Sequence, residues 1–428
     1  MKKVLILAYD FPPYNSIGAQ RPASWLKYLK QFGWQPIVVT RHWDADIKNE
    51  IDYIKPSKKI TIEVEESDEG TVIRVPFIPN LRDRIILKYG MGKMVMPRKA
   101  FTFFLQLFRF RMPQLDATFS IYQAAKDYLT SNKVDLIIAT GEPFILFLHA
   151  QKLSKKFNIP YLLDYRDCWT NAPHIAEMGL LDKWLHETHF RKIEKHVVKK
   201  AEMLTAAAPS YAKKLRLLHE EKNIQVLLNG FFPFASQTKI TLEQVFTISY
   251  AGIFYAHQRL EIFLKGFNLL VDRYPKNKFS LRFYGLSFYP EMVERVKKSC
   301  SSKALGHIVF TERIPYDVLQ ARLRSSHILL LLSAKDANWL NAKIFDYLQA
   351  SRKILLVEND QGILEQIINE CQAGVTADTP EEVAALLELY YQEWVETGEL
   401  KHQTVNYEQF SRENQTKRLA ELLDKYVG

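Results

Sequence analysis

Runs of apolar, largely β-branched residues alternate along the chain with stretches of helical spacing, such as 119–132 and 145–158. Each run is short and apolar on both faces, which is typical of a buried strand in a parallel sheet covered by helices. In the first half of the chain, strands are predicted at 4–8, 36–40, 71–75, 134–140, 160–165, 203–208 and 224–229.

The alternation stops at 231–244, which is polar and has no clear period, and then restarts. The strands predicted after this break are 246–252, 279–285, 307–312, 327–334 and 353–359. The pattern predicts two doubly wound α/β domains, at 1–235 and 246–395. An amphipathic helix within 396–428 is expected to pack back toward the first domain. Ligands of such sheets bind at the carboxyl ends of the strands, so two facing domains would form a two-substrate cleft.

Length and composition narrow the class of protein. A chain of 428 residues is too long for one ordinary core, and 47% apolar with 25% charged residues is normal for a globular protein. Three widely spaced cysteines favour a reducing compartment over a disulfide framework. The apolar start is too short for a secretory signal, and no apolar run approaches the ~18 residues of a membrane span. A cytoplasmic protein is expected.

The first candidate site is the opening loop "LAYDFPPYNSIGAQRP", residues 7–22, which follows a predicted strand and is longer than an ordinary strand–helix connection. Gly18 would let backbone amides approach a phosphate or a sugar, and Arg21 would add a charged fork of donors at the helix start. A plain surface loop with a solvated arginine explains the same residues.

The second candidate is "LLDYRDCWT", which also follows a strand. Asp164, Arg166 and Asp167 would gather at the strand end and bind a polyol or act as acid and base, and Trp169 would stack on a sugar ring. The alternative is a self-neutralising ion cluster beside a packed aromatic side chain.

The third candidate lies in the second domain. In "YAGIFYAHQRL", Gly252 ends a strand and Arg259 precedes a helix, a pattern that suits a diphosphate. In "NAKIFDYL", Lys343 opposes the macrodipole near a helix start, which favours an anionic ligand, and Asp346 one turn later suits ribose hydroxyls. An exposed i,i+3 ion pair is the alternative for the last two residues.

Six motifs occur in this order: "FPP…GAQRP", "GEP…LDYRDCWT", "YAGIF…R", "FYG", "ERIPYDVL" and "NAKIFDYL". The set resembles family-4-type (group 1) retaining glycosyltransferases of the GT-B fold, which serve bacterial cell-surface polysaccharide biosynthesis. The resemblance implies a nucleotide-diphosphate sugar as donor, no cofactor, and a glycan or lipid-linked glycan as acceptor.

The resemblance also implies roles for individual residues. Asp164 and Asp167 would be the catalytic pair that faces the transferred sugar or the acceptor. The acceptor side would carry Arg21, Arg166 and Trp169. The donor would contact Gly18, Gly252, Arg259, Lys343, Asp346 and, beside the nucleobase, Arg313.

The chain departs from the family pattern at four positions: Asn338 stands for an acid, Cys168 for a proline, Ser351 for a glycine and Lys353 for a proline. These changes concern contacts to the donor sugar. They leave two rival functions in place, namely a non-catalytic scaffold or membrane adaptor with this fold, and a sugar-nucleotide epimerase or phosphorylase.

The catalytic step is expected to need no metal. The family's favoured front-face route requires charge stabilisation on the leaving diphosphate, which Arg259 and Lys343 would supply. The "WDAD" at 43–46 imitates a metal-binding D-x-D, but it lies in a polar loop outside the motif set.

The net charge of +10 is concentrated at 81–115, where eight basic residues meet one acid, Asp83. The same segment holds "FTFFLQLF" and Met91, Met94 and Met96, and a second basic stretch lies at 190–202. This combination indicates docking on an anionic inner leaflet, and a helix pair with a solvated basic face is the equal alternative. No nucleic-acid-binding module is recognised, so a nucleic acid partner is not expected.

Overall fold

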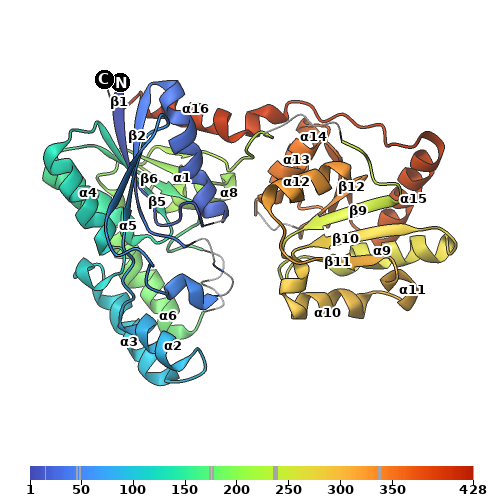
Figure 1. The fold of residues 1–428 in the computed structure, drawn as a ribbon, viewed down its shortest axis with the longest axis horizontal. Coiled ribbons are helices and arrows are strands. Elements are labelled where there is room, and N and C mark those ends of the chain that lie inside the picture. The colour runs from blue at the N-terminus through green and yellow to red at the C-terminus, as the bar shows by residue number, and fades with distance from the viewer. Residues whose placement is uncertain are drawn as a thin grey trace. The chain divides into compact units, whose positions relative to one another are not determined.

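A computed structural model describes residues 1–428 except 15, 45–46, 48–49, 173–174, 176–177, 235–239, 336–338 and 428. The chain divides into two compact units (Figure 1). Unit 1 comprises Met1–Asn229 and Arg412–Gly428, and unit 2 comprises Gly230–Ser411.

Unit 1 is built on an eight-stranded sheet with the order β3-β4-β2-β1-β5-β6-β7-β8. All neighbouring strands are parallel except the edge pair β3 and β4. The strands are β1 (Lys2–Leu7), β2 (Trp34–Arg41), β3 (Glu63–Glu66), β4 (Thr71–Val75), β5 (Leu136–Gly141), β6 (Tyr161–Tyr165), β7 (Met203–Ala206) and β8 (Ile224–Val226).

Helices cover both faces of this sheet, with α4 and α5 on one side and α1 and α16 on the other (Figure 1). In β1, Leu5 and Leu7 face the core under α4 and α5, while Val4 and Ile6 face the core under α1 and α16, because strand side chains alternate. The α-helices of unit 1 are α1 (Ile17–Tyr28), α2 (Leu81–Tyr89), α3 (Val95–Phe108), α4 (Phe119–Ser131), α5 (Ile145–Phe157), α6 (Leu180–Trp184), α7 (Arg191–Val198), α8 (Pro209–Leu218) and α16 (Arg412–Leu423).

Unit 2 has a fully parallel six-stranded sheet with the order β11-β10-β9-β12-β13-β14. Numbered within the unit, this is the Rossmann order 3-2-1-4-5-6, and the order reverses between β9 and β12. The strands are β9 (Phe246–Ala251), β10 (Phe279–Tyr284), β11 (Ile308–Phe310), β12 (Ile328–Leu332), β13 (Lys353–Val357) and β14 (Gly374–Ala377).

The helices of unit 2 pack closely on their sheet and on one another. A Cβ on Gly266 of α9 would lie 2.5 Å from Cγ1 of Val383 on α15, so this helix crossing requires glycine. The α-helices are α9 (Leu260–Arg273), α10 (Pro290–Ser299), α11 (Ser302–Leu305), α12 (Tyr316–Ser325), α13 (Lys343–Ala350), α14 (Ile363–Glu370) and α15 (Pro380–Thr397).

The two predicted parallel α/β sheets are confirmed, and every predicted strand coincides with an observed one apart from its ends. Two strands were not predicted. The strand β3 reads "EVEE" and is mostly exposed, so it lacks an apolar signal, and β14 is a four-residue edge strand. Within the described residues, no helix is both long enough and apolar enough to cross a bilayer.

Candidate functional site

At the carboxyl end of β6 in unit 1, Asp164 forms a buried ion pair with Arg21. Asp164 is fully buried, and Arg21 reaches its two carboxylate oxygens with Nη2 at 2.7 Å and Nε at 3.0 Å. The hydroxyls of Thr140 and Thr205 donate to the same carboxylate at 2.8 and 2.6 Å. With its oxygens occupied and no exposed surface, Asp164 supports the sheet edge. Arg21 is buried as well, so neither side chain is open to a substrate in this structure.

Arg166 joins three loops at the same edge. Its Nε donates to the Gly141 carbonyl at 2.6 Å, and Nη1 lies 3.0 Å from Oδ2 of Asp10. A Cβ on Gly18 would lie 1.8 Å from Nη1 of Arg166 and 2.7 Å from Oδ2 of Asp10. Gly18 therefore leaves room for this guanidinium, a reason that lies within unit 1 and involves no ligand.

The two neighbours of Cys168 differ in exposure. Asp167 is exposed, and Tyr211 donates a hydrogen bond to it at 3.2 Å. Trp169 is buried, and its ring stacks on Phe144 with centroids 5.1 Å apart and on Phe110 at 5.3 Å. The expectation of a sugar-stacking Trp169 is thus corrected, because core aromatics cover the ring. Burial also raises the pKa of Cys168 to about 12, so its thiol stays protonated.

Beside this edge lies a hollow of about 360 Å³ that the sequence reasoning missed. Its lining includes four acids, Asp10, Asp83, Asp116 and Glu142, and one arginine, Arg82. The signal for Asp10 was present, since it closely follows the carboxyl end of β1. The other acids come from separate segments that only the fold brings together.

The corresponding edge of unit 2 holds a lysine against a carbonyl. Lys343 is the first residue of α13, and its Nζ donates to the Ile253 carbonyl at 2.9 Å, across the point where the strand order reverses. Burial lowers the pKa of Lys343 to about 8, and the charge of Asp346 opposes this shift. Gly252 has a φ of +79°, and a Cβ there would lie 3.3 Å from Cε of Lys343. Glycine thus allows both the backbone turn and the approach of the lysine.

Arg259 precedes α9 and is exposed. Within the described part of the chain, its guanidinium has no hydrogen bond and no ion pair. Three aromatic rings gather in the same region: Tyr255 stacks on His257 with centroids 5.8 Å apart, and Trp339 meets Tyr255 edge-on at 5.2 Å. The sequence predicted no role for these three rings.

The two remaining donor candidates are each held by a neighbour. Asp346 accepts from the Tyr316 hydroxyl at 2.5 Å and from Nε2 of Gln320 at 3.0 Å, and both donors lie on α12. Arg313 lies over the Phe288 ring, 4.3 Å from its centroid, and donates to the Tyr289 hydroxyl at 2.5 Å.

Two of the residues that depart from the family pattern, Ser351 and Lys353, have identifiable local surroundings. Ser351 ends α13 in the left-handed region with φ +50°, the conformation that glycine adopts most easily. Lys353 lies over the Tyr390 ring at 4.2 Å. Asn338 lies outside the described residues, as do Ala45 and Asp46 of the "WDAD" stretch. The described residues contain no group of three or more potential ligands that could hold a metal ion.

No protein-family model and no curated protein matches the chain. Solved structures do match over its whole length. A glycosyltransferase from Rickettsia africae aligns with a TM-score of 0.59 at 15% identity, covering 99% of this chain and 97% of that one. Anabaena HepE in complex with UDP and glucose gives 0.59 at 11% identity, covering 99% and 100%.

A third match is the catalytic domain of starch synthase IV from Arabidopsis thaliana, bound to ADP and acarbose. It aligns with a TM-score of 0.57 at 11% identity, covering 100% of this chain and 99% of that chain. At identities this low, the matches establish a shared fold and nothing finer. With its two parallel Rossmann-like sheets, the chain has the GT-B fold of nucleotide-sugar glycosyltransferases.

Proposed function

We propose that this protein transfers a sugar from a nucleotide-diphosphate sugar to a glycan or a lipid-linked glycan, with retention and without a metal. The observation that carries the proposal is the pair of cations in unit 2. Lys343 lies beside Gly252 where the strand order reverses, and Arg259 is exposed nearby along the chain. Ligands of open α/β sheets bind at this edge, and a diphosphate is the ligand that suits two cations there.

The proposed mechanism is electrostatic. As the bond to the sugar breaks, negative charge grows on the leaving diphosphate, and Lys343 and Arg259 stabilise that charge. The same diphosphate accepts the proton of the acceptor hydroxyl, so no protein nucleophile is needed. Asp346 binds the ribose, and Arg313 lies against the nucleobase.

The acceptor half of the proposal rests on unit 1. Asp167 is exposed at the end of β6, and the acid-lined hollow lies at the same edge of the sheet. Carboxylates accept hydrogen bonds from sugar hydroxyls, so this hollow suits a neutral glycan. In this scheme Asp167 orients the acceptor. The side chains of Asp164, Arg21 and Arg166 stabilise the carboxyl edge of the sheet in unit 1.

Calorimetry with UDP, ADP and GDP tests the donor site directly. Arg259→Ala and Lys343→Met should each weaken binding of the preferred nucleotide about 10-fold to 100-fold, because each removes a charge-assisted contact. Lys265→Ala, at an exposed position on α9, is the matched control and should bind like the wild type. Unchanged affinity in both site variants would refute the assignment.

Turnover assays test the remaining parts of the proposed function, namely metal independence and transfer to an acceptor. Transfer should survive excess chelator, and loss of activity with rescue by Mn²⁺ or Mg²⁺ would refute metal independence. Consumption of the donor without an acceptor product would favour an epimerase or a phosphorylase. Nucleotide binding without turnover on any acceptor would favour a non-catalytic scaffold.

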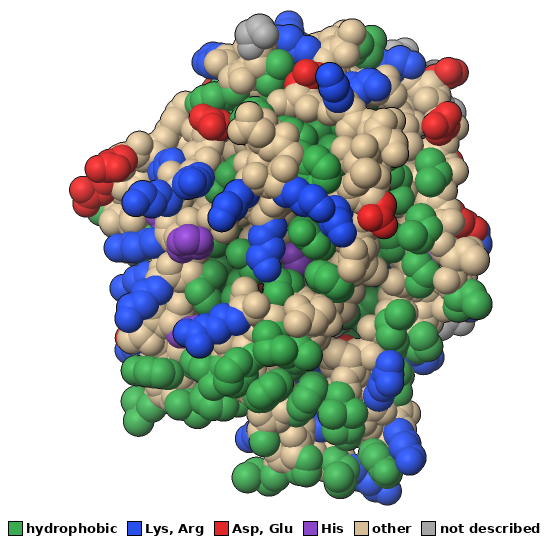
Figure 2. All heavy atoms as spheres, turned by 90° about the vertical axis from the view of Figure 1, so that its left-hand side faces the viewer, with side chains coloured by type: hydrophobic (Ala, Val, Ile, Leu, Met, Phe, Trp, Pro, Cys, Tyr) green, Lys and Arg blue, Asp and Glu red, His purple; other side chains and the backbone are tan. Residues whose placement is uncertain are grey.

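We further propose that the enzyme works at an anionic membrane surface through α3. This helix of 14 residues has no buried residue, and its exposed apolar side chains include Val95, Met96 and Phe104. In Figure 2 the left-hand side of the view of Figure 1 faces the reader. Hydrophobic side chains lie along the lower edge of that face, below a group of Lys and Arg side chains. The apolar residues would enter the interface while the basic ones contact lipid headgroups.

Vesicle flotation tests the membrane proposal. Each basic residue contributes about 1 kcal/mol near an anionic leaflet, so the triple variant Lys93→Glu, Lys99→Glu, Arg111→Glu should lose salt-sensitive binding. All three residues are exposed, so the fold should be retained. If the wild type does not bind anionic vesicles at low salt, the proposal fails.

A further inference from the structure

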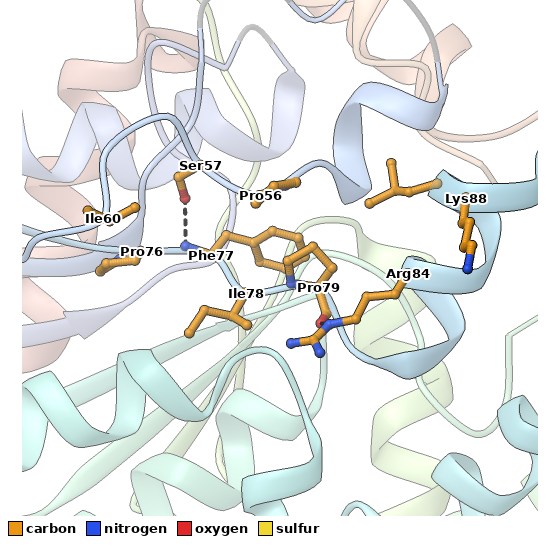
Figure 3. A pocket seen from close by; sticks show the side chains of 10 residues that line it. Pro56, Ser57, Ile60, Pro76, Phe77, Ile78, Pro79, Arg84 and Lys88 are labelled. Atoms are coloured by element: carbon orange, nitrogen blue, oxygen red, sulfur yellow. Dashed lines mark hydrogen bonds between the residues drawn. The ribbon is translucent and has the colours of Figure 1, made fainter.

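Unit 1 contains an apolar cavity of about 620 Å³ between the segments 56–60 and 76–79 and the helix α2. Most of its wall is hydrocarbon, contributed by Pro56, Ile60, Pro76, Ile78 and Leu87. Figure 3 shows Pro56, Ile60, Pro76 and Ile78 around the cavity, with Arg84 and Lys88 on the side of α2.

The mouth of the cavity is apolar and exposed. Ile60 is 83% exposed and Ile78 is 62% exposed, although isoleucine is usually buried. Three prolines, Pro56, Pro76 and Pro79, line the cavity. Proline has no N–H, so a peptide bound here would find few backbone donors for its carbonyls, whereas a hydrocarbon chain needs none.

Basic groups stand at one side of the cavity only. Arg84 and Lys88 are four residues apart on α2 and therefore lie on the same face of the helix. Nε of Arg84 donates to the Pro79 carbonyl at 2.9 Å, which holds the guanidinium against the cavity wall. An anionic group attached to a buried chain would meet both cations.

The acid-lined hollow adjoins this cavity, because Phe77 lines both. Asp10, Asp116 and Glu142 line the hollow together with Arg82, and carboxylates of this kind accept hydrogen bonds from sugar hydroxyls. Within unit 1, an apolar site with two cations in its wall thus adjoins a site lined by carboxylates.

We propose that the cavity binds the hydrocarbon chain of a lipid-linked acceptor, with its anionic linking group beside Arg84 and Lys88 and its sugar in the acid-lined hollow. The identification of the ligand as an acceptor rests on the proposed glycosyl transfer. The binding of an anionic amphiphile by this cavity does not, and it can be measured separately.

A chain-length series tests the cavity itself. Octyl, decyl and dodecyl phosphate, each below its micelle concentration, should bind with an affinity that rises about fourfold for each methylene until the cavity is full. Dodecyl glucoside, which lacks the anionic group, should bind more weakly than dodecyl phosphate. An affinity independent of chain length would overturn the proposal.

Variants at the mouth locate the bound chain. Ile60→Asp and Ile78→Asp should each lower the affinity for dodecyl phosphate more than tenfold. Ile62→Asp is the matched control, since Ile62 is 56% exposed and does not line the cavity. Equal losses in the control and the site variants would overturn the proposal.

Two further variants separate the cavity from α3 and test the cations. Met96→Asp on α3 should leave the affinity for dodecyl phosphate unchanged. If this variant loses affinity for dodecyl phosphate, the hydrocarbon chain binds on the apolar face of α3 and not in the cavity. Lys88→Glu should lower the affinity for dodecyl phosphate but not for dodecyl glucoside, with Lys133→Glu as the exposed control.

Nucleotide binding distinguishes this proposal from the proposed function. The variants of the cavity should bind UDP, ADP or GDP like the wild type. If no nucleotide binds but alkyl phosphates do, the glycosyl transfer fails and the cavity stands. If Ile60→Asp changes vesicle flotation and leaves dodecyl phosphate affinity unchanged, the cavity rim contacts the bilayer and the proposal is overturned.

Discussion

The sheets of the two units resemble each other, but the charged residues at their carboxyl edges have different partners. In unit 1, Arg21 pairs with Asp164 and Arg166 pairs with Asp10. In unit 2, Lys343 bonds to a backbone carbonyl, and neither it nor Arg259 has a carboxylate within 4.0 Å among the described residues. An arginine paired within its own unit stabilises the fold, whereas a cation without such a partner is available to an anionic ligand.

The largest expected effect on stability comes from removing Asp164, the buried acid of unit 1. Asp164→Ala leaves Arg21 charged and uncompensated in the interior, so the free energy of unfolding should fall by about 3–5 kcal/mol. Urea denaturation followed by circular dichroism measures this change. Asp167→Ala, at an exposed position, should change stability by less than about 0.5 kcal/mol. A similar effect of both variants would contradict the structural role of Asp164.

The second prediction concerns Gly18. In Gly18→Ala the new methyl group would overlap the pinned guanidinium of Arg166, so the variant should lose about 1–3 kcal/mol. The double variant Gly18→Ala, Arg166→Ala should be no less stable than Arg166→Ala alone, because the clash is then absent. Additive losses in this cycle would show that Gly18 acts through another contact.

The third prediction uses the lowered pKa of Lys343 in unit 2. Below about pH 8 the lysine is protonated with or without ligand, so diphosphate affinity should not depend on pH. Above pH 8 binding must restore the proton, and the affinity should fall by up to about tenfold per pH unit. Calorimetry from pH 7 to 9.5 measures this fall.

Lys343→Met is the control, and its affinity should be flat over the same range. Stability changes in the opposite direction. The unfolded lysine binds its proton up to about pH 10.4, so between pH 8 and that value the cost of burying the charge decreases and the folded state gains stability. A decline of affinity that persists in Lys343→Met would assign the titration to another group.

The smallest expected effect compares a helix end in each unit. Ser351 ends α13 with φ +50°, and Asn158 ends α5 with φ +55°. Ser351→Gly should stabilise unit 2 by roughly 0.5–1 kcal/mol, because glycine adopts this conformation without steric cost. Asn158→Gly should gain less, since asparagine tolerates the left-handed region. Thermal unfolding of both variants measures the difference.

The fold was predictable because buried parallel strands are apolar on both faces, a signal that each strand carries in its own residues. Gly252 and Lys343 were selected separately as candidates, one at the end of a strand and one at the start of a helix, and only the fold shows that they lie together. What the sequence does not contain is the direction of a side chain near such an end. Asp164 points into the core and Asp167 to solvent, although they are only three positions apart.

The apolar cavity and the acid-lined hollow could not be predicted for another reason. The hollow combines residues from distant segments, such as Tyr9, Phe77, Asp116 and Pro143, and the cavity joins three segments between Pro56 and Lys88 that carry no motif. Trp169 illustrates the converse. Its position beside two acids suggested a ligand, but the rings that cover it, Phe110 and Phe144, come from other segments.

The antiparallel strand β3 affects how the protein behaves at high concentration. An unpaired sheet edge offers a row of backbone donors and acceptors to any other strand, which is a route to aggregation. Here that edge carries three charged side chains, Glu63, Glu65 and Glu66, which a second strand would have to desolvate in order to pair with it. The outermost strand of the larger sheet thus acts against self-association while it adds little to the core.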